Sequence, residues 1–133
     1  MERAVCRLVH RFAQTLDIHA RQVAEQVGLT ASQVVALREL AEPITSRELA
    51  NRMSCEPSNV TFVVDRLERL GLVRRQPHPR DRRAKEIVLT AEGEDRRADV
   101  LELLTASSPL RSLTGEQQRA LVTMLEVLDT QRT

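Results

Sequence analysis

The chain has 133 residues, 41% of them hydrophobic and 29% charged, which is typical of one soluble globular domain and excludes a disordered or fibrous protein. No apolar run approaches the roughly 20 residues needed to span a bilayer, and the N-terminus lacks the order of a signal peptide, so we expect a cytoplasmic protein without a membrane segment. The formal net charge is +1, but residues 44–90 hold ten Arg or Lys against six Asp or Glu, and this local excess predicts a surface that binds a polyanion.

Apolar residues recur every three or four positions over the first forty residues and predict two helices. Gly28 is expected to end the first helix, and Thr30 with Gln33 forms a capping box that begins the second. The same pattern occurs at Thr45 with Glu48 and at Thr114 with Gln117. Each occurrence predicts the start of another helix.

Two helices follow the short Ile44-Thr45 segment, one over 46–53 and one from Pro57 to Leu70. Proline suits a first helical position, and Gly71 is expected to end the second helix. At 100° per residue, this second helix has an apolar side expected to face the core and a polar side expected to be exposed. The apolar side holds Val60, Val63, Val64, Leu67 and Leu70, and the polar side holds Ser58, Thr61, Phe62, Asp65, Arg66 and Arg69.

The next segment predicts an antiparallel hairpin with strands over 72–76 and 85–89 and a long basic tip, PHPRDRRA. Thr90 is expected to cap a helix through about residue 106. The SSPL stretch breaks it, and a last helix is expected over roughly 114–131. Two helices joined by a tight turn and followed by a hairpin predict a winged helix-turn-helix, a mainly α fold with a small β-hairpin wing.

The exposed side of the helix at 57–70 carries groups that can bind base edges or phosphates in a major groove. Phe62 is the exception on that side. Its ring can contact a thymine methyl group, or it can pack beneath the hairpin or against a partner protein. Asn59 lies at the flank, within reach of a phosphate or a base.

Three arginines, Arg80, Arg82 and Arg83, lie at the hairpin tip. Guanidinium groups suit a narrow minor groove, where the negative potential is enhanced. Asp81 is expected to orient one of these arginines through a bidentate pair. The alternative is a solvated basic loop with no ligand.

The stretch from Ile44 to Gly93, above all SNVTFVVDRLERLGLVRRQPHPRDRRAKEIVLTAEG, resembles the MarR family of transcription regulators. The recognition-helix pattern, the L-E-x-x-G-L-V exit, the D-x-R wing and the L-T-x-x-G entry into the next helix occur in the family's order. Gly28-Leu29-Thr30 stands where the family joins its first two helices, so the resemblance covers nearly the whole chain.

The resemblance implies a homodimer on double-stranded DNA, with residues 30–90 as the winged-helix lobe and residues 1–29 and 91–133 as dimerisation helices. It implies base-reading roles for Ser58, Asn59, Thr61, Phe62 and Arg66. It also implies a minor-groove role for Arg83 supported by Asp81, and phosphate contacts from Thr45 and Ser46 at a helix start. Small, often aromatic effectors bind some relatives in a cleft between the dimer helices and the lobe, which Phe12 and His19 could approach. A core histidine is the alternative for His19.

Two cysteines, Cys6 and Cys55, are too far apart and too few to predict a disulfide framework or a zinc site. Cys6 and His10 share a helix face, with His19 further along, but the sequence supplies no full set of metal ligands. Cys55 precedes a helix whose positive end could lower the pKa of its thiol and make it oxidisable. Cys6 lies where peroxide-sensing relatives carry a reactive cysteine, yet the tyrosines found around it there are absent here.

Enzyme motifs such as G-x-S-x-G, a glycine-rich phosphate loop and H-E-x-x-H are absent, and no cofactor is expected. The lack of Trp and Tyr disfavours a reader of single-stranded nucleic acid. We therefore expect a dimeric transcription regulator, more readily a repressor, that binds a pseudo-palindromic operator and is released, if at all, by a small molecule. The alternatives are a cysteine-based redox sensor and a winged helix used for protein contact.

Overall fold

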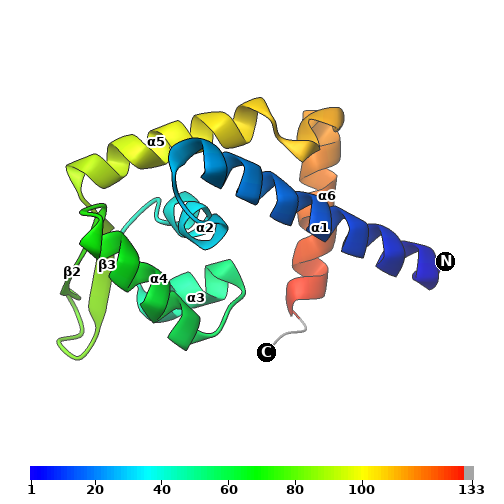
Figure 1. Cartoon of the computed structure of the whole chain (residues 1–133). Coiled ribbons are helices and arrows are strands. Elements are labelled where there is room, and N and C mark those ends of the chain that lie inside the picture. Colours follow the sequence, from blue (N-terminus) through cyan, green and yellow to red (C-terminus); the bar gives the residue numbers. More distant parts are fainter. Residues whose placement is uncertain (131–133) are drawn as a thin grey trace.

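The computed structural model describes residues 1–130 and contains six α-helices, three short strands and one 3-10 helix in that range (Figure 1). In chain order these are α1 (Glu2–Val27), α2 (Ala31–Glu39), β1 (Ile44–Thr45), α3 (Ser46–Met53), α4 (Pro57–Arg69), β2 (Val73–Pro77), β3 (Lys85–Leu89), α5 (Ala91–Ala106), η1 (Pro109–Ser112) and α6 (Gly115–Asp129). The predicted winged helix-turn-helix, mainly α with a small β-hairpin wing, is confirmed. Gln131, the expected end of the last helix, lies outside the described residues.

The predicted helix boundaries follow from local hydrogen bonds. Thr30, Thr45 and Thr114 each form a complete capping box, so both the threonine hydroxyl and the side chain three residues later satisfy backbone N–H groups. Gly28 and Gly71 adopt left-handed conformations, with φ of 70° and 76°, directly after α1 and after the cap residue of α4. These are conformations in which a side chain would be strained.

The sheet has three strands in the order β1-β3-β2, all antiparallel. The β2–β3 hairpin is the predicted wing, with its first strand one residue later than expected. Ile44 pairs with Ile87 and so makes the short segment before α3 a third strand. This pairing joins residues 43 positions apart, which local sequence patterns do not reveal.

The core lies in the lobe where α2, α3, α4 and the sheet meet the end of α1 and the middle of α5. It comprises Val23, Ala24, Val34, Ala36, Leu37, Leu40, Ile44, Leu49, Ala50, Val60, Val64, Leu67, Leu72, Val73, Ile87 and Val100. Leu70 was predicted to join it but is 52% exposed. The helix ends at Arg69, Gly71 turns the chain, and Leu72 takes the buried position instead.

Two long helices extend outside this core. In α1 the buried residues lie in the second half, between His19 and Ala24, while its N-terminal half projects away from the lobe (Figure 1). No residue of α6 between Gly115 and Asp129 is buried. Within residues 1–130, no helix combines the length and the apolar character that crossing a bilayer requires.

Candidate nucleic-acid interface

The helix-turn-helix presents the polar side of α4 to solvent. Val60, Val64 and Leu67 are fully buried and fix this helix on the lobe, and Val63 is half-buried. Pro57 occupies the first helical position, as predicted. The residues of α4 that the sequence singled out, four on the opposite side and Asn59 at the flank, are all exposed: Ser58, Asn59, Thr61, Phe62 and Arg66. The Thr61 hydroxyl also donates a hydrogen bond to the Pro57 carbonyl, at 3.1 Å.

Phe62 is exposed and does not pack under the hairpin. The residue is 63% exposed, and the Arg66 guanidinium lies over its ring, 5.0 Å from the centroid. This distance is within the range of a cation–π contact. The two side chains therefore form a pair on the exposed side of α4.

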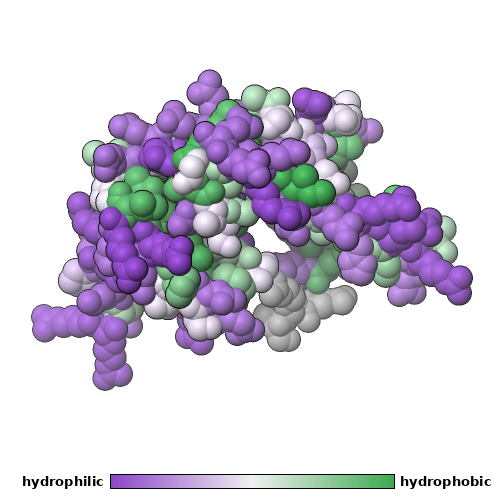
Figure 2. All heavy atoms as spheres, in the orientation of Figure 1, coloured by the Kyte–Doolittle hydropathy of each residue, from purple (hydrophilic) through white to green (hydrophobic). Residues whose placement is uncertain are grey.

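The wing tip holds its backbone in place and leaves its arginines in solvent. His78 Nδ1 accepts hydrogen bonds from the backbone N–H groups of Arg80 and Asp81, at 3.0 and 3.2 Å. All three predicted arginines, Arg80, Arg82 and Arg83, are exposed. In Figure 2, hydrophilic side chains project from the same end of the molecule as the hairpin.

Asp81 acts differently from the prediction. Its carboxylate accepts the backbone N–H of Arg83 at 3.0 Å, and within residues 1–130 it forms no ion pair with an arginine. A hydrogen bond from an aspartate to the backbone two residues later stabilises a turn directly, whereas an ion pair with an arginine side chain would not hold the backbone. Asp81 thus fixes the tip backbone rather than a guanidinium.

An ion-pair cluster that the sequence analysis missed joins the wing to α4. Arg75 on β2 donates to Asp65 Oδ1 at 2.7 Å and to Glu68 Oε1 at 2.9 Å. Arg75 therefore offsets the negative charge of two carboxylates on α4. These ion pairs form only when β2 folds back against α4. The spacing of residues in the sequence does not predict that contact.

The start of α3 is occupied by its own capping box. The Thr45 N–H donates to Glu48 Oε1 at 3.4 Å, and the Thr45 hydroxyl oxygen accepts from the Glu48 N–H at 3.1 Å. Glu48 therefore already engages Thr45 at this helix end. Phosphate contacts from Thr45 and Ser46 stay a prediction.

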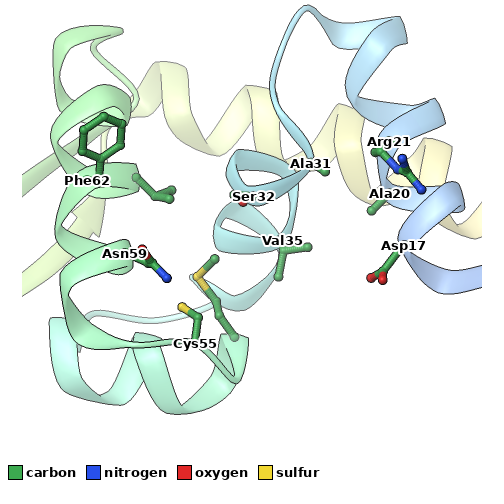
Figure 3. Close-up of a pocket in the computed structure, with 11 residues that line it drawn as sticks. Asp17, Ala20, Arg21, Ala31, Ser32, Val35, Cys55, Asn59 and Phe62 are labelled. Carbon is green, nitrogen blue, oxygen red and sulfur yellow. The ribbon is translucent and has the colours of Figure 1, made fainter. Parts of the chain in front are cut away.

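A groove of about 580 Å³ separates α4 from α1 and α2 (Figure 3). Asn59, Phe62 and Cys55 lie on one wall, and Asp17 and Arg21 of α1 lie on the other. The two residues expected near such a cleft, Phe12 and His19, do not line this groove. Phe12 is half-buried on α1.

His19 is a buried residue at the junction of α1 and α5. Its Nε2 atom lies 2.9 Å from Ser107 Oγ, and burial lowers the pKa of the imidazole. The alternative of a core histidine is therefore the one that the structure favours.

The cysteines give little support to a redox role. Burial, with a further contribution from the Glu56 carboxylate, raises the pKa of the Cys55 thiol. The expected lowering by the helix end is therefore wrong, because desolvation and a neighbouring negative charge both disfavour a thiolate. Cys6 is exposed on the projecting half of α1.

Comparison with known proteins identifies relatives of one kind. The sequence model of the MarR family matches residues 29–85. The repressor MdtR of Bacillus subtilis is 37% identical over 79 residues, which are 58% of this chain and 51% of MdtR, so the chain spans about half of that relative. The transcriptional regulator HosA of Escherichia coli O111:H- is 30% identical over 111 residues, 81% of this chain and 77% of HosA.

Solved structures agree with this relationship. A cysteine-to-serine mutant of MarR from E. coli, complexed with operator DNA, superposes with a TM-score of 0.74 at 26% identity, covering 94% of this chain and 93% of that one. The matched length includes the helices outside the lobe as well as the winged helix. The fold, the matched family model and the similarity to HosA agree, and the chain belongs to the MarR family of transcriptional regulators.

Proposed function

We propose that this protein is a sequence-specific regulator that binds double-stranded operator DNA as a homodimer and acts as a repressor. The observation that carries the proposal is the pairing of two exposed elements. The polar side of α4 and the arginine-bearing wing tip belong to one end of the molecule and are joined through Arg75 (Figure 1). A helix for the major groove and arginines for the adjacent minor groove are what a winged helix needs to bind a duplex.

The dimer is supported by the helices outside the core. Residues 1–29 and 91–133 would form the dimerisation part, and residues 30–90 the DNA-binding lobe. Apolar side chains on α1 and α6 are exposed, among them Val5, Leu8, Val9, Leu16, Val122, Leu125 and Leu128. A soluble monomer rarely exposes so many apolar side chains on two helices. Two symmetric recognition helices about 34 Å apart would require a pseudo-palindromic site.

Release by a small molecule is supported by the groove beside α4. Its volume, about 580 Å³, is in the range of small-molecule sites. Asn59 and Phe62 line the groove and also belong to the exposed side of α4. A molecule bound there would contact Asn59 and Phe62, two side chains that we assign to the operator. Its binding would therefore compete directly with operator binding and relieve repression.

The test is selection of bound sequences from a random duplex library, followed by titration of the selected duplex in increasing salt. We expect a palindrome and, for about six to ten phosphate contacts per dimer, a slope of log affinity against log salt near −5 to −9. Arg83→Ala should weaken binding and flatten the slope. Arg38→Ala, an exposed arginine on α2 outside the residues that we assign to DNA or to the dimer, serves as the matched control and should change neither.

Recovery of no consensus, together with an almost flat response to salt, would contradict the proposal. A winged helix used for protein contact would give that outcome. MdtR is named a repressor, and transcription from the selected palindrome, measured with and without the protein, distinguishes repression from activation.

A further inference from the structure

Phe62 is an unusual residue for the exposed side of a recognition helix, since it brings a large apolar ring to a polar surface. Phe62 is 63% exposed, and the guanidinium carbon of Arg66, one turn further along α4, lies over its ring at 5.0 Å from the centroid. It is the one contact between a guanidinium and an aromatic ring found among residues 1–130. Arg69 lies on the same side of the helix, outside that contact.

An exposed arginine has several rotatable bonds and loses conformational entropy when it is held for a bidentate contact. A ring beneath the guanidinium reduces that loss, because the cation is already confined over one face before DNA arrives. The planar guanidinium keeps its N–H groups directed outward from its edge, which is the geometry for O6 and N7 of a guanine.

We propose that Phe62 is a positioning residue that acts through Arg66, holding its guanidinium for bidentate contact with a guanine in the major groove. This inference rests on the proposed function, since it requires that α4 meets duplex DNA. It assigns base discrimination to the pair rather than to either side chain alone. A direct contact between the ring and a thymine methyl is the competing role for Phe62.

The experiment is a double-mutant cycle on the selected operator and on operators with each G·C pair replaced in turn. Phe62→Leu keeps an apolar side chain that can contact a methyl group but removes the aromatic face. We expect this change to reduce discrimination at one guanine by about 3- to 30-fold, the range of a cation–π contact that becomes partly desolvated. Arg66→Ala should remove discrimination at the same guanine, and the double variant should be no worse than Arg66→Ala.

Two further variants make the result specific. Phe62→Trp keeps the aromatic face and should restore discrimination to near the wild-type level, which a role in folding alone would not predict. In a parallel cycle with Arg69→Ala, the losses caused by Phe62→Leu and Arg69→Ala should multiply, because Arg69 does not stack on the ring. Circular dichroism checks that each variant is folded.

The inference is overturned if the losses from Phe62→Leu and Arg66→Ala multiply, or if Phe62→Trp is as weak as Phe62→Leu. Replacing each operator thymine by uracil tests the competing role, since uracil lacks the methyl group. The ring would be assigned to thymine by two results together. The wild-type protein would bind the uracil operator more weakly while Phe62→Ala would not, and the losses from Phe62→Leu and Arg66→Ala would multiply. If the wild-type protein binds no duplex, the proposed function fails first and the inference falls with it.

Discussion

Gly93 lies where the first turn of α5 passes the chain that leaves α4. A Cβ atom at this position would collide with the Leu72 carbonyl oxygen, which already accepts the Thr90 N–H at 3.0 Å. The Thr90 hydroxyl meanwhile donates to the Gly71 carbonyl and accepts the Gly93 N–H. The glycine of the L-T-x-x-G motif is therefore required by close backbone packing.

Gly93→Ala should lower the free energy of unfolding by about 1–3 kcal/mol, because the cost of overpacking exceeds the gain in helix propensity. Urea denaturation measures this change in the free energy of unfolding. Gly115→Ala is the matched control at the start of α6, where the added Cβ would lie 3.5 Å from the Arg119 side chain, an ordinary contact. Equal effects of the two substitutions would show that the Leu72 collision is not the cause.

His19 should make stability depend on pH. The Ser107 hydroxyl donates to the Leu103 carbonyl at 2.9 Å, so its oxygen is left to accept the Nε2–H of a neutral imidazole. Burial lowers the pKa of His19 below its usual value. His19 lines two surface hollows; Arg111 lines both, Arg38 lines one, and no carboxylate of the described chain lines either. A proton on His19 would therefore be uncompensated.

The sign of the effect follows from where the proton binds. As pH falls through about 6.5, the usual pKa of histidine, the unfolded chain takes up a proton and the folded chain does not, so the free energy of unfolding decreases. Wild-type protein should therefore lose stability relative to His19→Gln between pH 7.5 and 5.5, measured by urea denaturation at both values. Parallel pH profiles for the two proteins would contradict this account.

At the scale of elements, the helices could be predicted because their determinants are local. Threonine caps and left-handed glycines set the boundaries within a few residues, and the apolar periodicity identified the buried side of α4. Pairings across the chain could not be predicted. Arg96 donates to the Val27 carbonyl at 2.6 Å and Arg97 to the Leu37 carbonyl at 2.8 Å, so α5 caps the ends of α1 and α2 from about 60 or more positions away.

The same distinction explains what was predicted of the site. The exposed residues of α4 and the wing arginines followed from helical spacing and composition. The role of Asp81 and the ion pairs of Arg75 depend on the folded hairpin. Both backbone and side-chain partners are available to such a residue, and only the folded geometry determines which of them it binds. Spacing alone therefore identified which residues are presented, and the structure shows how they are held.

Arg75 tests whether contacts that only the folded structure reveals affect DNA binding. Arg75→Ala should weaken binding to specific and random duplex alike by on the order of 1 kcal/mol, about fivefold, because Asp65 and Glu68 would then face phosphates uncompensated. Protein stability should change by less than about 1 kcal/mol, since these pairs lie at the surface. Fluorescence anisotropy with labelled duplexes measures the binding.

The matched variant removes the carboxylates as well. Arg75→Ala combined with Asp65→Asn and Glu68→Gln should recover near wild-type affinity if Arg75 acts by offsetting their charge. Persistent weakness in the triple variant would instead indicate that Arg75 contacts DNA itself, as we propose for Arg83.

At the scale of the whole molecule, one chain leaves two helices without a full set of neighbours. The exposed apolar residues of α6 include Val122, Met124, Leu125, Val127 and Leu128. At 100° per residue, Val122, Leu125 and Leu128 share one side of the helix, while Val127 and Met124 lie toward the side of Thr123. A second copy of the chain would cover such a surface and would also supply the second recognition helix for a palindromic site. Oligomeric state and operator affinity are therefore expected to change together.

Leu125→Asp combined with Leu128→Asp should convert a dimer of 15.1 kDa chains into monomers, because charged side chains would be buried at the interface. Sedimentation equilibrium measures the mass, and affinity for the palindrome should fall by about 100-fold or more as the two half-sites lose their linkage. Affinity for a single half-site should be unchanged, since the lobe is untouched. Thr123→Asp, on the opposite side of α6, should leave both mass and affinity as they are, and a doubly substituted protein that still sediments as a dimer would place the interface elsewhere.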